Sequence, residues 1–220
     1  MAVNDFRTNL PAGFRLEETE HGLELSREGE RSGRGVRAEL QWSRPGPHPL
    51  RRALRGAPGA VVDATAGLGV DAGLVASLGR PVLAIERDPI LHAMLVDARA
   101  RLADAETADR ITLVHADARS LLCSLPAPFE RPAAVLLDPM YPTRRSASAL
   151  PPKSMQFLRA LLHGADHEGE IDSLFVAAMS SSARRVVLKR PPEADPPQGV
   201  GTPTFSIETK LVRWDVWERG

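Results

Sequence analysis

The sequence predicts an α/β protein in which a mostly parallel sheet is covered by helices on both faces. Three observations predict it: short apolar runs alternate with segments of helical periodicity, a glycine-containing turn joins the first run to the first helix, and acidic residues follow four of the runs. Apolar runs of this length are typical of parallel strands that are buried on both sides. Their alternation with helices gives a doubly wound sheet.

The N-terminal part of the chain is expected to be an extension of this sheet domain. Residues 22–25 and 36–42 alternate apolar and polar side chains and predict a hairpin. A proline-containing break then precedes a short basic helix at 49–55. We expect an extension at 1–57, which lids the ligand cleft, and a main domain at 58–220.

The first strand and helix of the main domain are joined by a turn of the kind that binds nucleotides. An apolar strand at 60–63 leads through Gly67 and Gly69 into a helix at 72–78. These glycines allow positive φ and a close approach of the backbone to a ligand. The turn lacks the Gly-Lys-Ser/Thr of a phosphate loop, and residue 72 is Ala where the dinucleotide fingerprint has its third glycine.

Acidic residues end or follow four successive predicted strands. They are Asp63 after residues 60–63, Glu86 at the end of 81–86, Asp117 after 111–115 and Asp138 after 133–137. Helical patterns lie between them at 90–102 and 120–125. Because the carboxyl ends of parallel strands meet at one edge of a sheet, these acids predict a polar ligand cleft there. Glu86 is placed to accept the hydrogen bonds of a ribose diol.

The turn after the fourth strand reads Asp138-Pro139-Met140-Tyr141-Pro142. Its two prolines fix the backbone on either side of Met140 and Tyr141 and so present the aromatic ring and the peptide carbonyls stiffly. This geometry suits a flat, amine-bearing group. The alternative is an ordinary proline-rich turn after a core strand.

Together these motifs resemble those of class I S-adenosylmethionine-dependent methyltransferases, and most closely the RsmJ-type ribosomal RNA small-subunit methyltransferases. The resemblance rests on residues 62–69, 86–89, 137–142 and 186–191. It implies a Rossmann-like fold with a mostly parallel seven-stranded sheet, helices on both faces and a small N-terminal β-hairpin. It also implies methylation of the exocyclic N2 of a guanine in small-subunit ribosomal RNA.

The resemblance implies S-adenosylmethionine as the cofactor. The positions that match the cofactor site of the family are Asp63, Ala66, Gly67, Gly69, Val70, Asp71, Glu86, Arg87, Asp117, Ala118 and Asp138. The loop residues would surround the methionine part, Glu86 the ribose and Arg87 the adenine. The family usually has two serines where this chain has Asp117 and Ala118, and often Phe where it has Tyr141.

Catalysis is assigned to Asp138, Pro139 and Tyr141. A base amine is a poor nucleophile because its lone pair is delocalised into the ring. Hydrogen bonds accepted by the Asp138 carboxylate and the Pro139 carbonyl would favour the positive charge that develops on it. Tyr141 would stack on the base, which must first leave its RNA helix.

Basic residues cluster although 28 Lys and Arg balance 28 Asp and Glu. Those predicted to contact RNA phosphates are Arg144, Arg145, Lys153, Lys189 and Arg190. The arginines of the N-terminal third fit a solvated face equally well. A neutral chain is expected to bind naked RNA weakly, so the small ribosomal subunit, assembled or partly assembled, is the expected partner.

Other residue types argue against several classes of protein. The single cysteine, Cys123, excludes an internal disulfide, is interpreted as a small buried residue in a helix, and favours the cytoplasm. The histidines show no metal-ligand spacing, since Gly164 and Gly169 argue against a helix that would align His163 with His167. His48 is a possible cofactor or RNA contact. No metal and no membrane span are expected.

Rival functions remain open at this point. A nicotinamide-dependent oxidoreductase would share the loop and the ribose acid, but it would not need the Asp-Pro-Met-Tyr-Pro turn. An RNA-binding module without a cofactor would need a stacking platform, whereas aromatic residues are only 5% of the chain. Within the methyltransferases, adenine N6 or a protein glutamine is a planar amine that the same turn would fit.

Overall fold

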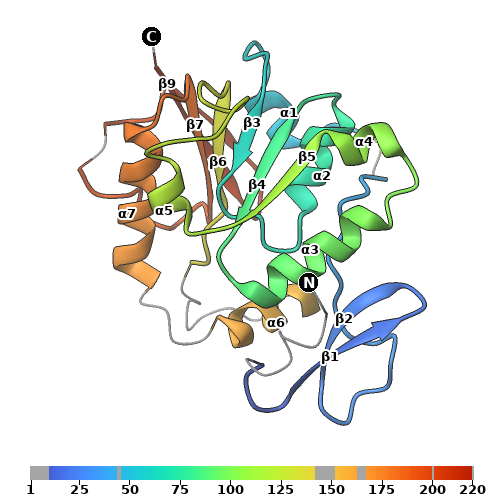
Figure 1. Cartoon of the computed structure of the whole chain (residues 1–220). Helices are drawn as coiled ribbons and strands as arrows, with labels where there is room; N and C mark the ends of the chain where they lie inside the picture. The colour runs from blue at the N-terminus through green and yellow to red at the C-terminus, as the bar shows by residue number, and fades with distance from the viewer. Residues whose placement is uncertain (1–9, 44–45, 142–151, 163–166, 200, 220) are drawn as a thin grey trace.

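A seven-stranded sheet forms the centre of the protein (Figure 1). The computed structural model describes residues 10–43, 46–141, 152–162, 167–199 and 201–219. The strands are β3 (Val61–Asp63), β4 (Val82–Glu86), β5 (Ile111–His115), β6 (Ala134–Leu137), β7 (Arg185–Arg190), β8 (Phe205–Glu208) and β9 (Arg213–Glu218). Their order is β5-β4-β3-β6-β7-β9-β8, and β9 runs antiparallel to both of its neighbours. The mostly parallel seven-stranded sheet is therefore confirmed.

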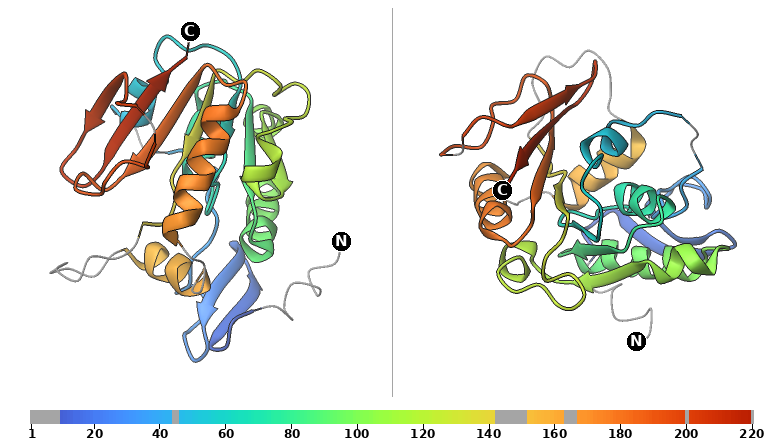
Figure 2. Two further views of the ribbon diagram at one scale, coloured as in Figure 1. Left: turned by 90° about the vertical axis from the view of Figure 1, so that its left-hand side faces the viewer. Right: turned by 90° about the horizontal axis from the view of Figure 1, so that it is seen from above.

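Helices cover both faces of the sheet (Figure 2). Both faces need covering, because successive side chains along each apolar strand point to opposite sides of the sheet. They are α1 (Pro49–Ala53), α2 (Val70–Ser77), α3 (Pro89–Ala100), α4 (Ala105–Asp109), α5 (Ala118–Leu121), α6 (Lys153–Leu161) and α7 (His167–Ser180). Val61 lies in one apolar core with residues of α1, α2, α3 and α6. Val62 lies in a second core with residues of α5 and α7. The successive residues Val61 and Val62 thus pack on opposite faces of the sheet.

The N-terminal hairpin uses other residues than the sequence predicts. It pairs β1 (Phe14–Thr19) with β2 (Gly22–Arg27), and Gly22 has a φ of 101° where the chain turns. The expected partner, residues 36–42, contributes only an isolated bridge from Val36 to Leu25. The expectation was wrong because residues 14–19 were not recognised as a strand, although their polar and apolar side chains alternate and only two residues separate them from Gly22.

Residues 36–42 instead run along the glycine loop that precedes α2. The Glu39 amide donates to the Leu68 carbonyl at 2.8 Å, and the buried Leu40 side chain joins the core formed with α2 and α3. The hairpin itself is tied to α3, because the Leu23 amide donates to the Asp97 carboxylate at 2.9 Å. The extension therefore shares one apolar core with the sheet and leads directly to the predicted cofactor loop.

Several other expectations can be compared with the structure. The helix expected at 90–102 is confirmed by α3. Gly169 lies within α7, but His163 lies outside the described residues, so the expectation about its alignment with His167 stays a prediction. Cys123 follows α5 and is exposed, so its interpretation as a buried helical residue was wrong. No helix within the described ranges is long and apolar enough to cross a membrane.

Candidate active site

The predicted acids lie together at the carboxyl edge of the parallel strands. Asp63 and Glu86 are the last residues of β3 and β4, and Asp138 directly follows β6. These three strands are adjacent and parallel in the sheet. Asp117 follows β5, the neighbour of β4, and caps the N-terminus of α5 by accepting from the Arg119 amide at 2.9 Å.

The glycine loop is held against this edge by hydrogen bonds. The Ala66 amide donates to the Ile85 carbonyl at 3.1 Å, and the Gly67 amide donates to the Glu86 carboxylate at 2.8 Å. Gly67 and Gly69 have φ angles of 53° and 88°, in the left-handed region that favours glycine. A Cβ at Gly67 would meet no atom of the described residues nearer than 3.8 Å, so the backbone there is open to a ligand.

Four carboxylates form what we call the acidic cluster: Asp63, Asp71, Glu86 and Asp138. Asp63 is 2% exposed and accepts one hydrogen bond, from the Thr65 amide at 3.2 Å. Burial raises its pKa to about 8, and the charges of the other three carboxylates contribute in the same direction. Burial also raises the pKa of Glu86. The four carboxylates therefore disfavour one another's ionisation, and Asp63 is mostly protonated at neutral pH.

Lys189 on β7 is the cation that forms ion pairs with this cluster, as far as the described residues show. Its Nζ lies 2.6 Å from Oδ2 of Asp138 and 3.6 Å from Oδ2 of Asp71. The Asp138 amide donates to the Thr65 hydroxyl at 2.7 Å, which holds the start of the Asp-Pro turn against the loop. The sequence predicts a phosphate contact for Lys189, whereas the structure pairs it with carboxylates.

Tyr141 closes the described part of the Asp-Pro turn. Its phenol oxygen is buried and has no hydrogen-bond partner in the described part of the chain. Burial raises the pKa of the phenol above its usual value, so the hydroxyl is neutral at physiological pH. Pro139 and Met140 are half-buried beside it. The stacking role of Tyr141 stays a prediction.

The residues predicted around the adenine are engaged with each other and with α7. Arg87 makes two hydrogen bonds of 2.8 Å to the Glu170 carboxylate, which raises the pKa of the guanidinium. Arg119 forms an ion pair with Asp117 and lies 4.0 Å from Glu170. Ala118 is buried at the start of α5. Sequence reasoning missed Glu170, because no local pattern links it to a strand end 83 residues away.

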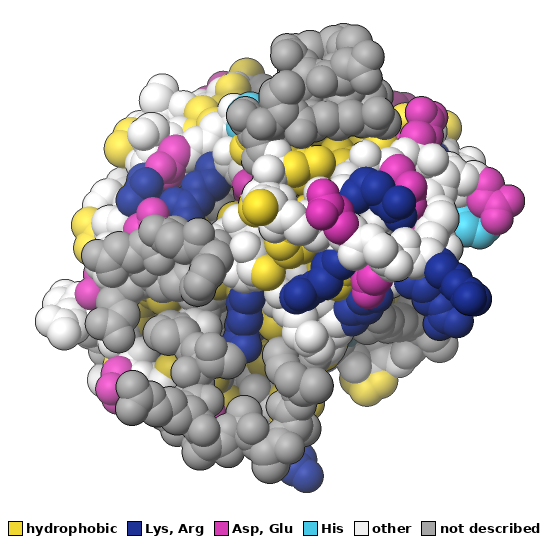
Figure 3. All heavy atoms as spheres, turned by 90° about the horizontal axis from the view of Figure 1, so that it is seen from below, with side chains coloured by type: hydrophobic (Ala, Val, Ile, Leu, Met, Phe, Trp, Pro, Cys, Tyr) yellow, Lys and Arg dark blue, Asp and Glu magenta, His cyan; other side chains and the backbone are white. Residues whose placement is uncertain are grey.

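The other basic residues predicted to contact RNA divide into three cases. Arg190 was wrongly interpreted as a phosphate contact, because its side chain is 7% exposed and forms an ion pair with the buried Asp215 at 2.7 Å. Lys153, the first residue of α6, lies 2.9 Å from the Glu30 carboxylate. Arg144 and Arg145 lie outside the described residues. The view from below shows Lys and Arg side chains interspersed with acidic and apolar ones (Figure 3).

His48 has a structural position. It caps α1 by accepting from the Leu50 amide at 3.3 Å. Its ring contacts Trp42 and Trp214 edge to face, with centroids 5.1 and 6.0 Å apart. These structural contacts account for His48, and its contact with cofactor or RNA stays a prediction. The row of rings connects the extension with β9.

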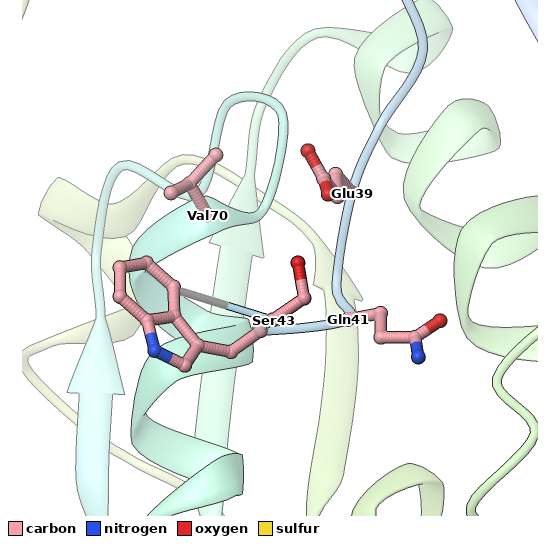
Figure 4. Close-up of a pocket in the computed structure, with 5 residues that line it drawn as sticks. Glu39, Gln41, Ser43 and Val70 are labelled. Carbon is pink, nitrogen blue, oxygen red and sulfur yellow. The ribbon is translucent and has the colours of Figure 1, made fainter. Parts of the chain in front are cut away.

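A shallow hollow lies beside the glycine loop, between the extension and α2. It is small, with a volume of about 10 Å³, and Figure 4 shows its residues from the extension around Val70. The residues that line it are Glu39, Gln41, Trp42, Ser43 and Val70. Val70 is 40% exposed although it begins α2. The extension thus borders the predicted cofactor loop, and the proposal that it acts as a lid rests on this position.

Comparisons with known proteins identify the family of the chain. A family model described as "Putative SAM-dependent methyltransferase" matches residues 48–219. The chain is 44% identical over 179 residues to a ribosomal RNA small subunit methyltransferase J of Rhodopseudomonas palustris, covering 77% of this chain and 78% of the relative. The relative of the same name from Vibrio vulnificus is 41% identical over 172 residues, covering 74% of this chain and 65% of its own.

A solved structure supports the same assignment of the fold. The crystal structure of an S-adenosylmethionine-dependent methyltransferase from Neisseria gonorrhoeae matches with a TM-score of 0.71 and 29% identity, covering 94% of this chain and 84% of that protein. The match extends over the N-terminal extension as well as the sheet, because it includes nearly the whole chain.

Proposed function

The chain belongs to the family of S-adenosylmethionine-dependent methyltransferases that includes ribosomal RNA small subunit methyltransferase J, and from this membership we propose that it methylates the exocyclic N2 of a guanine in small-subunit ribosomal RNA. The observation that supports this most directly is the position of the Asp138-Pro139-Met140-Tyr141 turn beside the acidic cluster. An amine-gripping turn and a site for a cationic cofactor then share one edge of the sheet.

The residues of this edge fit S-adenosylmethionine. Bound there, the cofactor supplies a methyl group on a sulfonium, so that an N–C bond forms as the C–S bond breaks and the electron pair remains on sulfur. The acidic cluster suits its positive charges, because Lys189 alone of the described cations forms ion pairs with it. Glu86 would accept from the ribose hydroxyls, and the open backbone at Gly67 would lie against the methionine part.

The turn would hold and activate the base amine. The Asp138 carboxylate and the Pro139 carbonyl accept hydrogen bonds from it, which directs the nitrogen lone pair and favours the charge that develops as the new bond forms. The amine then loses one proton, which the Asp138 carboxylate accepts and passes to water. Tyr141 would stack on the base and keep water away from the reacting atoms.

The partner we propose is the small ribosomal subunit or its RNA, in the cytoplasm where subunits assemble. Arg144, Arg145 and Lys153 are proposed to contact phosphates around the extruded nucleotide. Lys153 would have to exchange its Glu30 partner for phosphate, at little cost, because exposed ion pairs contribute at most about 1 kcal/mol.

The test is transfer of radiolabelled methyl groups from S-adenosylmethionine to small subunits that lack the modification, followed by nucleoside analysis. We expect label in N2-methylguanosine with the wild type and none with Asp138→Ala. Asp109→Ala, an exposed change at the end of α4, is the matched control and should keep full activity. Label in N6-methyladenosine or in protein would overturn the guanine assignment, and an active Asp138→Ala would overturn the site.

A further inference from the structure

Lys189 and Asp138 are placed side by side by the register of two neighbouring strands. Leu137 of β6 pairs with Leu188 of β7, so the next residue of each chain segment lies at the carboxyl edge. Leu188 belongs to the core on the side of α5 and α7. Lys189 therefore points to the opposite face, where α2 lies.

Three groups surround the ammonium of Lys189. Oδ2 of Asp138 is 2.6 Å from Nζ, and Oδ2 of Asp71, near the start of α2, is 3.6 Å from it. On a third side Nζ lies 5.1 Å from the centre of the Trp214 ring, within the range of a cation–π contact. The lysine side chain is 24% exposed.

The surroundings of Lys189 are themselves fixed. Trp214 pairs with Lys189 across β7 and β9 and is buried, and the ring of His48 packs against it. Asp71 belongs to α2, whose first turn follows the glycine loop. A lysine held between two carboxylates and a buried indole has little freedom to reach outward to RNA.

We propose that Lys189 is a positioning residue for methyl transfer: its ion pair fixes Oδ2 of Asp138 and leaves Oδ1 to accept a hydrogen bond from the amine of the base. This inference rests on the proposed function, because it assigns a second residue to the same site. Oδ1 of Asp138 makes no hydrogen bond to any described residue. Lys189 also supplies the charge that keeps Asp138 ionised beside the other acids.

The charges of the acidic cluster explain why Asp138 needs the positive charge of Lys189 to stay ionised. Burial alone would lower the pKa of Lys189, but the carboxylates of Asp138 and Asp71 outweigh it and raise that pKa, so the ammonium keeps its proton. The pKa of Asp138 is raised by partial desolvation and by Asp71, and Lys189 opposes both, although the Asp138 side chain is 41% exposed. Without Lys189, protonation of Asp138 would compete with its role as hydrogen-bond acceptor.

The first experiment is a carboxyl ¹³C NMR titration of Asp138 in the complete chain, with its resonance assigned through Asp138→Asn. In Lys189→Met, which keeps most of the length of the side chain but removes the charge, we expect Asp138 to titrate at a higher pH than in the wild type. Lys189→Arg, which keeps the charge, should titrate close to the wild type. Identical titrations of the wild type and Lys189→Met would overturn the proposal.

The second experiment is methyl transfer to small subunits across a range of pH. We expect Lys189→Met to lower kcat at neutral pH at least about tenfold and to move the acid limb of the profile to higher pH, with KM for the subunit unchanged. A phosphate contact would instead raise that KM and reduce its dependence on salt at unchanged kcat. Such a result would overturn the positioning role.

Lys210→Met is the matched control, because Lys210 is an exposed lysine in the turn between β8 and β9 and forms no ion pair with the acidic cluster among the described residues. It should leave the Asp138 titration and the pH profile unchanged. If the wild type transfers no methyl group to the subunit, the proposed function fails, while the NMR titration still decides whether Lys189 controls Asp138.

Discussion

The backbone of Leu40 lies directly against Gly73, so closely that no side chain fits between them. A Cβ atom at Gly73 would lie 2.3 Å from the Leu40 carbonyl oxygen and 2.7 Å from its carbonyl carbon. Gly73 lies inside α2, where its φ needs no glycine. The glycine is therefore required by packing: it lets the extension lie across the helix that follows the cofactor loop.

Gly73→Ala should destabilise the protein although alanine is the better helix former. The collision is with backbone, which cannot move aside as a flexible side chain can, and overpacking of this kind costs about 1–3 kcal/mol. The free energy of unfolding in urea would measure it. Gly169→Ala in α7 is the control, because nothing lies within 4 Å of its Cβ, and it should stabilise by up to about 1 kcal/mol. Equal effects of the two changes would contradict the packing argument.

Arg190→Met should reduce stability and leave binding of the ribosomal subunit unchanged. The guanidinium neutralises Asp215, which is 0% exposed and also accepts from Nε of Arg213 at 2.7 Å. Removing one partner of a buried ion pair costs about 3–5 kcal/mol, and Arg213 should soften that loss. Thermal unfolding measures the first effect and KM for the subunit the second. A raised KM with unchanged stability would restore Arg190 as an RNA contact.

Asp63 should make the protein less stable as pH rises. Its pKa is about 8 in the folded protein against 3.8 as the ordinary value, so the stabilisation is complete below pH 3.8 and is lost as pH rises through 8. The slope from this one group is at most about 1.4 kcal/mol per pH unit. Asp63→Asn, which is neutral throughout, should unfold with a flatter dependence on pH over this range. Parallel curves for the two proteins would show that Asp63 is ionised when folded.

Sequence reasoning identified the sheet and the edge that carries the site because both depend on local patterns. Buried strands appear in the sequence as apolar runs, and Asp63, Glu86 and Asp138 lie at or directly after the ends of these runs. Parallel pairing then brings these ends together without any further information. Gly67 and Gly69 were found for the same reason, since a positive φ has a local signature.

The contacts that were missed join residues far apart in the chain. Lys189 and Arg190 follow each other in the sequence, yet one faces the acidic cluster and the other the buried Asp215. Successive side chains of β7 point to opposite faces of the sheet, which separates the two. The acid that each one meets comes from another element, α2 on one face and β9 on the other. Arg87 was expected to be available for adenine, but Glu170 of α7 binds it. Charge alone does not tell a phosphate contact from an internal ion pair.

Gly67→Val should abolish binding of S-adenosylmethionine in calorimetry while the protein stays folded. Among the described atoms, only the Thr65 carbonyl oxygen would lie within 4 Å of a Cβ at Gly67, at 3.8 Å, so the added side chain would displace a ligand and not a neighbouring element. Valine at a positive φ also costs about 1–3 kcal/mol in backbone strain, which must be separated from the loss of binding. Gly79→Val makes that separation, because Gly79 has a φ of 76°, is equally uncrowded and lies at the far end of α2. Both variants should lose similar stability, and only Gly67→Val should lose the cofactor. Equal binding by the two variants would place the cofactor away from the glycine loop.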